Sequence, residues 1–107
     1  MWNWFKKSDT TYKNLDSEEF IRQSSQKGVT LLDVRTKGEF QSGHLKGAIH
    51  LDFFDPSFKE QLNKLPKEKA YFVYCRSGNR SAKTCTTLHH LGFENVHNLA
   101  GGMMELV

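Results

Sequence analysis

The sequence predicts an α/β domain in which a mostly parallel central sheet of about five strands is covered by helices on both faces. Short apolar, β-branched runs alternate along the chain with segments that carry helix-capping residues and helical periodicity. This alternation is typical of βαβ units, whose parallel strands are buried on both sides. The chain has 107 residues, which suits one domain that buries roughly two-thirds of its unfolded surface.

A short lead-in precedes the first predicted helix. Residues 1–11 place three aromatic residues ahead of the first lysines, the wrong order for a secretory signal. We expect the folded domain at 12–107. Its first helix should start after Asp16, because Asp16 and Glu19 have the spacing of a capping box. Gly28 is the expected stop.

The same signals then recur along the chain. The apolar run at 29–34 predicts a buried strand. Thr36 and Glu39 repeat the capping-box spacing, so a short helix is expected to begin there and to end near Gly43. A further short strand is expected at 47–53.

The second half continues the alternation. We expect, in order, a helix closed by Pro66, a strand at 70–75, a helix at 80–92, a strand at 94–99 and a last turn or short helix. The segment 70–75 is the clearest strand in the chain, because it is almost entirely apolar and aromatic.

This clearest strand ends on a cysteine, in the stretch YFVYCRSGNRS. Ligands of parallel α/β sheets collect at the carboxyl ends of the strands. The following helix start, Arg76 and Arg80 all favour the thiolate form of Cys75, and Gly78 permits a turn of inward-pointing N–H groups. A lone cysteine after a strand is commonly a small core residue, but this setting predicts a reactive thiol.

The sequence marks no clear catalytic partner for this thiol. A cysteine hydrolase needs a histidine base, and none of the five histidines is marked as one. His44 is kept as a candidate close to the site, and the others are expected to be surface or capping residues. Cys85, well into the next helix, is expected to pack rather than to resolve a disulfide. No spacing supports a metal site.

Charge and cysteine content exclude several classes of function. The formal charge is +3, with the lysines dispersed, which fits small anions better than nucleic acid. The longest apolar run is far shorter than a membrane helix requires. Two cysteines are too few for a disulfide framework, so we expect a reducing cytoplasm.

Two stretches of the chain resemble the single-domain rhodanese family. LLDVRTKGEFQSGHLKGAIHLD fits the pattern D-V-R-x-x-x-E-F-x-x-G-H-(I/L)-x-G-A of that family. YFVYCRSGNRSAKTCTTLHHLGFENVHNLAGG fits its active-site loop, helix, L-G-F turn, last strand and terminal G-G. The resemblance runs from Asp33 to Gly102 and implies a rhodanese-like fold. Leu106 stands where many members carry a tryptophan, which implies a more open site rim or a need for a partner.

The resemblance implies a sulfurtransferase. Cys75 would take a sulfane sulfur from an anionic donor such as thiosulfate, hold it as a persulfide and pass it to a thiol or to cyanide, without a cofactor. Asp33, Arg35 and Glu39 would shape the sheet edge, as structural residues first. The residues implied to hold donor and persulfide are Arg76, Ser77, Gly78, Asn79, Arg80 and Ser81, with Ser81 lending a hydroxyl or capping the helix.

Two alternatives remain open from the sequence. The domain could be a persulfide carrier or an interaction module that serves a partner protein with little small-molecule turnover. A cysteine-loop phosphatase or arsenate reductase is the remote alternative. Those enzymes place five residues between the cysteine and the closing arginine, whereas four separate Cys75 from Arg80 here. The smaller ring suits one sulfur atom better than a phosphate, and no aspartate is marked as the general acid.

Overall fold

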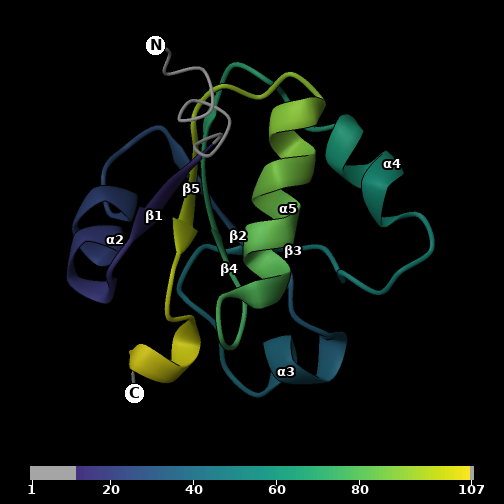
Figure 1. Cartoon of the computed structure of the whole chain (residues 1–107). Helices are drawn as coiled ribbons and strands as arrows, with labels where there is room; N and C mark the ends of the chain where they lie inside the picture. Colours follow the sequence, from purple (N-terminus) through teal and green to yellow (C-terminus); the bar gives the residue numbers. More distant parts are fainter. Residues whose placement is uncertain (1–11, 107) are drawn as a thin grey trace, which may run out of the picture.

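A computed structural model describes residues 12–106, which form a five-stranded parallel sheet with helices on both faces (Figure 1). The predicted lead-in, with its aromatic residues, lies outside this part of the chain. In chain order the elements are β1 (Lys13–Leu15), α2 (Ser17–Ser24), β2 (Val29–Asp33), α3 (Lys37–Gln41), β3 (Ile49–His50), α4 (Phe58–Asn63), β4 (Ala70–Tyr74), α5 (Asn79–His90), β5 (Val96–Leu99) and a 3₁₀ turn (Met103–Glu105).

The sheet has the strand order β1-β5-β4-β2-β3, and every neighbouring pair is parallel. β4 therefore lies at the centre between β5 and β2, and four of its five residues are buried. The predicted fold class is confirmed. The carboxyl end of β4 meets those of β2 and β5 at one edge, which is where the chain turns toward α5 (Figure 1).

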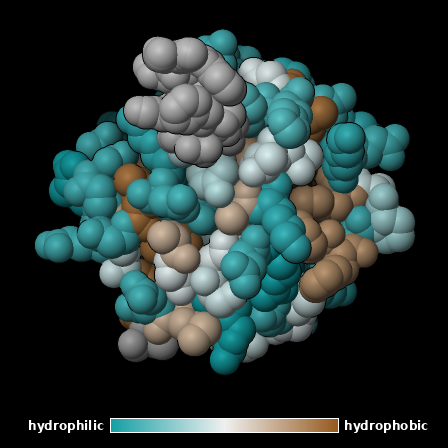
Figure 2. All heavy atoms as spheres, viewed as in Figure 1, coloured by the Kyte–Doolittle hydropathy of each residue, from teal (hydrophilic) through white to brown (hydrophobic). Residues whose placement is uncertain are grey.

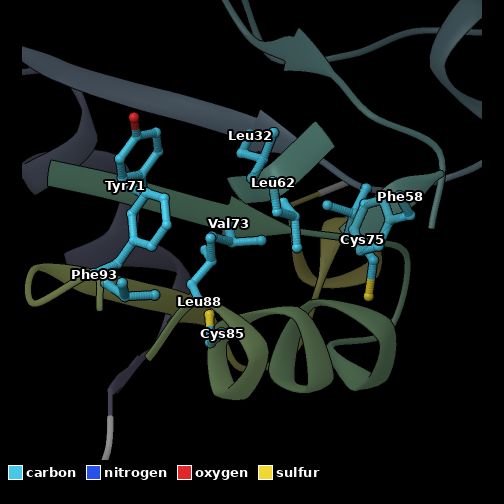
Figure 3. Packing of buried hydrophobic residues seen from close by; sticks show 11 residues of the cluster. Leu32, Phe58, Leu62, Tyr71, Val73, Cys75, Cys85, Leu88 and Phe93 are labelled. Atoms are coloured by element: carbon cyan, nitrogen blue, oxygen red, sulfur yellow. The ribbon is translucent and has the colours of Figure 1, made fainter. Parts of the chain in front are cut away.

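The alternation of side chains along β4 divides the core into two clusters. Tyr71, Val73 and Cys75 face α4 and α5, among Leu62, Leu88 and other apolar residues (Figure 3). Phe72 and Tyr74 face the other way and pack with Phe20 of α2. The sequence of β4 is a continuous apolar run because each face of the strand is covered by a helix.

Two edge strands differ from the sequence prediction. β1 was not predicted, because its three residues are polar or partly exposed and show no alternation. It forms only by pairing with β5. The strand predicted at 47–53 is reduced to Ile49–His50, which pairs with the end of β2. Edge strands gain little from burial, so their sequence signal is weak.

The predicted capping boxes have different outcomes. At α3 the box is complete: Glu39 N–H donates to Thr36 Oγ1 at 3.3 Å, and Thr36 N–H donates to Glu39 Oε1 at 2.9 Å. At α2 it is half formed. Asp16 accepts from Glu19 N–H at 2.9 Å, but the Glu19 carboxylate accepts from Arg22 and Gln23 instead. Pairing within the helix replaces the return bond.

The end of the described chain packs against the core. Leu106, at the position expected to leave the rim open, contacts the cluster that contains Phe20. No helix within residues 12–106 has both the length and the apolar character that a membrane crossing requires.

Adjacent residues of α2 allow a test of the core. Phe20 is fully buried, with its ring edge-on to Phe72 at 5.6 Å and to Tyr74 at 6.4 Å, whereas Ile21 is 39% exposed. We expect Phe20→Ala to lower the free energy of unfolding by about 3–5 kcal/mol, and Ile21→Ala by less than about 1 kcal/mol. Urea denaturation measures both. Similar losses in the two variants would contradict the assignment of α2 as the cover of this face.

Candidate functional site

Cys75 lies directly after β4, with its sulfur turned toward the start of α5 (Figure 3). Its Sγ accepts hydrogen bonds from Gly78 N–H at 3.1 Å and Ser81 N–H at 3.3 Å, and Ser81 Oγ lies 3.3 Å away. Cys75, Gly78 and Ser81 are all buried. N–H groups at a helix start carry partial positive charge, so these donors form a site that suits an anionic acceptor.

Glycine is required at the turn of this loop. Gly78 has a φ of +100°, and a Cβ on it would lie 2.0 Å from the Ala100 carbonyl oxygen. Both the backbone angle and the close approach exclude a side chain. The loop therefore rests directly on the chain that leaves β5, which brings the Gly78 N–H to the sulfur.

The segment after β5 holds the loop in place through backbone hydrogen bonds, a role that the sequence did not predict. Met103 N–H donates to the Cys75 carbonyl at 2.9 Å, and Met104 N–H donates to the Arg76 carbonyl at 3.1 Å. Gly102 makes this approach possible, since a Cβ there would lie 2.2 Å from the Arg76 oxygen. The consecutive glycines Gly101 and Gly102 were the available signal. With these carbonyls bound outside, the loop N–H groups remain free to face inward.

The two loop arginines have different surroundings. Arg80 Nη1 and Nη2 donate to the two carboxylate oxygens of Glu39 at 2.9 and 3.2 Å, and its guanidinium lies 5.8 Å from the Phe54 ring. The hydrogen bond to Glu39 raises the pKa of Arg80. Arg76 is exposed, and it forms no ion pair with any of residues 12–106. The positive charge of Arg80 is thus largely offset, whereas that of Arg76 is not.

Asp33 and Arg35 form a buried pair at the end of β2. Arg35 Nε donates to Asp33 Oδ1 at 3.0 Å, and Nη2 donates to Oδ2 at 2.7 Å. The same Nη2 donates to the Gly43 carbonyl at 2.7 Å, beyond the end of α3. The bond to Asp33 raises the pKa of Arg35. The pair joins β2 to the end of α3, so its place in the structure fits the expected structural role.

Among the described residues, the remaining candidates form no hydrogen bond with the Cys75 sulfur. His44 is exposed, stacks on Phe40 with the ring centroids 3.7 Å apart, and has Nδ1 2.9 Å from the Phe40 carbonyl oxygen. Its polar contact is therefore within its own segment. Ser77 and Asn79 are exposed. His97 was expected at the surface or in a cap, but it is buried and stacks on Phe72 at 4.3 Å, and this burial lowers its pKa.

A pocket of about 570 Å³ opens beside the loop. Arg76 is the loop residue that lines it, while Cys75 itself is fully buried and does not. The other lining residues come from the end of β2, from α3 and its exit, and from the 3₁₀ turn: Arg35, Glu39, Ser42, Gly43, Met103 and Met104. The pocket thus contains Arg76, which has no ionic partner among residues 12–106 and directly follows the residue that carries the thiol.

The second cysteine lies away from the loop, on the helix that follows it. Cys85 lies on the buried face of α5, and burial raises the pKa of its thiol. A thiol kept protonated in the core is inert, so its position supports packing. Within residues 12–106 no three His, Cys, Asp or Glu side chains are grouped so that they could hold a metal ion.

The Glu39–Arg80 pair predicts a dependence of stability on pH. The hydrogen bond from Arg80 is the main cause that lowers the pKa of Glu39 from 4.5 to about 2. A depressed carboxyl pKa stabilises the folded state above the unfolded value, and this contribution is lost as the pH falls from about 5 toward 2. We expect Glu39→Gln to cost about 1 kcal/mol at pH 7, and the difference from the parent to shrink between pH 5 and 3.

Urea unfolding of both proteins across this pH range measures the difference. Glu94→Gln, which removes an exposed carboxylate that forms no ion pair with the described residues, serves as the control. A Glu39→Gln difference that stayed constant with pH would show that the pair does not stabilise the fold.

Known proteins resemble this chain over most of its length. A family model described as "Rhodanese-like domain" matches residues 16–107. A sulfurtransferase of Allochromatium vinosum is 33% identical over 91 residues, covering 84% of this chain and 83% of its own length. The chloroplastic thiosulfate sulfurtransferase 16 of Arabidopsis thaliana is 38% identical over 85 residues, or 70% of this chain and 71% of that protein.

Solved structures share this fold, and some relatives are longer than this chain. A rhodanese-like domain protein from Staphylococcus aureus has a TM-score of 0.77 at 28% identity and matches 89% of this chain and 91% of its own. A tRNA uridine(34) hydroxylase of Onion yellows phytoplasma is 33% identical over 95 residues, but only 31% of that protein is covered. Similar domains thus occur alone and inside larger proteins. With the family model matching nearly its whole length, this chain belongs to the rhodanese-like domain family of sulfurtransferases.

Proposed function

We propose that the protein moves a sulfane sulfur from an anionic donor such as thiosulfate to a thiol or cyanide acceptor through a persulfide on Cys75. The observation that carries this proposal is the ring of donors around Sγ, made of Gly78 N–H, Ser81 N–H and the Ser81 hydroxyl. Such a ring stabilises a negatively charged sulfur without a separate base. The sulfurtransferase names of the relatives support the same reaction.

Each half-reaction balances in sulfur and charge. The Cys75 thiolate attacks the outer sulfur of thiosulfate, a bond forms between the two sulfurs, and the electron pair of the broken S–S bond leaves with sulfite. In the second half-reaction the acceptor attacks the terminal sulfur, and the electron pair of that bond returns to Cys75. Because Cys75 is fully buried, the loop has to shift before a donor reaches the sulfur.

The surroundings of the arginines assign them different parts. Arg76 lines the pocket without an ionic partner among the described residues, so we propose that it attracts and orients the anionic donor. Arg80 is held by Glu39 and is proposed to keep the start of α5 in place. Ser77 and Asn79 would contribute to the exposed rim of the loop.

A second candidate function is delivery of the sulfur to a partner protein. The similar domain within the tRNA uridine(34) hydroxylase relative shows that such domains are joined to larger proteins. In that case the same persulfide would form, with low turnover toward small acceptors. A phosphatase is less well supported, because the donors converge on Sγ itself and four residues close the ring. Two free thiols agree with a reducing compartment such as the cytoplasm.

The persulfide itself can be detected by mass. Thiosulfate treatment should add one sulfur atom to the intact protein, and cyanide or dithiothreitol should remove it. Cys75→Ser should show no gain, whereas Cys85→Ser should gain as the parent does, because Cys85 is packed in the core. Retention of the gain in Cys75→Ser would overturn the assignment of the nucleophile.

The different surroundings of the arginines predict different losses. Arg76→Gln should slow persulfide formation from thiosulfate by about tenfold, the size of one charge-assisted contact. It should hardly change the rate at which Cys75 attacks the central sulfur of a neutral organic trisulfide, a reaction in which a thiolate leaves and a mixed trisulfide forms on Cys75. Arg80→Gln should slow both donors to a similar degree, since it unpairs Glu39 and loosens the loop. Stopped reactions read by intact mass give the rates, with Lys83→Gln, an exposed lysine of α5, as the control. Equal slowing of both donors by Arg76→Gln would contradict its proposed role.

A further inference from the structure

The pocket beside the loop is lined by both apolar and charged residues. Met103 and Met104 line one part of it and Arg76 another. Met104 is 54% exposed, and its backbone is held beside the loop because its N–H is bonded to the Arg76 carbonyl. Figure 2 shows apolar surface over this 3₁₀ turn. An exposed apolar side chain held this close to a reactive loop is available to contact a bound molecule.

The volume of the pocket exceeds what thiosulfate fills. Thiosulfate has five non-hydrogen atoms, and even at the ~30 Å³ of a water molecule for each atom it would occupy at most about 150 Å³. The pocket holds about 570 Å³, within the range of about 300–1,000 Å³ that organic ligands occupy. An inorganic donor would leave the methionine wall in contact with water.

We propose that the preferred sulfur donor carries an apolar organic group, and that Met104 is the residue that selects it. The anionic, sulfur-bearing end of the donor meets Arg76, and the organic group lies on the Met104 side chain. Methionine suits this task, because its flexible thioether adapts to varied shapes and makes favourable contacts with aromatic rings. This inference rests on the proposed sulfurtransferase function and names the class of donor for the same site.

The transfer from such a donor balances in the same way as from thiosulfate. With an organic thiosulfonate, the Cys75 thiolate attacks the terminal sulfur, and a new S–S bond forms on Cys75. The bond between that sulfur and the sulfonyl group breaks, and its electron pair leaves with the organic sulfinate. The product is the Cys75 persulfide anion, and no oxidant or reductant is consumed.

Two donors with the same reacting group test the inference. Methanethiosulfonate and benzenethiosulfonate differ only in the organic group, and their reaction with free cysteine corrects for intrinsic reactivity. The readout is the rate at which one sulfur is added to the parent protein, measured by intact mass. After correction we expect the parent to prefer the benzene donor by about tenfold. Met104→Gln should reduce this preference about fivefold, since it removes the apolar and sulfur–aromatic contact.

Matched variants separate the contact from general damage. Met104→Leu keeps an apolar side chain and should retain most of the preference, and Ile21→Gln, an exposed apolar residue of α2 outside this pocket, should leave it unchanged. An unchanged preference in Met104→Gln, with sulfur still added, would overturn this inference and leave the sulfurtransferase function standing. Failure of every donor, thiosulfate included, to add sulfur to the parent would overturn both.

Discussion

The site depends on two backbone hydrogen bonds, from Met103 and Met104 to the carbonyl oxygens of Cys75 and Arg76. A loop that points several N–H groups inward must direct its carbonyls outward, and buried carbonyls need partners. The segment after β5 supplies them, and only glycine at 102 lets it come close enough. Gly78 meets the same segment from the other side. The donors around the sulfur are thus held in place by contacts between the loop that precedes α5 and the segment that follows β5.

Ion pairing then determines which charge reaches the pocket. Three arginines lie near the sheet edge, but Arg35 is bonded to Asp33 and Arg80 to Glu39. Each of these pairs also joins secondary elements: the first connects β2 with the exit of α3, and the second connects α3 with α5. Partnered charges are well suited to building a rigid frame and poorly suited to capturing a free anion. Arg76, on the exposed side of the loop, keeps that capacity.

Membership of the rhodanese-like family and the geometry address different questions. The family gives the class of reaction, and its members include stand-alone sulfurtransferases and domains of longer proteins. Arg76 and the methionines of the 3₁₀ turn line the same pocket, and under the proposed function they would bind a donor that has both an anionic and an apolar part. Leu106, at the position expected to open the rim, is partly buried and packs against the cluster that contains Phe20.

The sequence by itself determined the α/β class, the central strands, the complete capping box at Thr36 and the position of Cys75 after β4, because each follows from local pattern and burial period. It did not reveal β1 or the shortness of β3, since edge strands exist through pairing with distant residues. Only the tertiary structure decided that Glu39 forms an ion pair with Arg80 and that His97 is buried. It also decided that the N–H groups of Met103 and Met104 form hydrogen bonds with carbonyls of the loop. These are contacts between segments far apart in sequence, and no local period encodes which partner a charge or a carbonyl will meet.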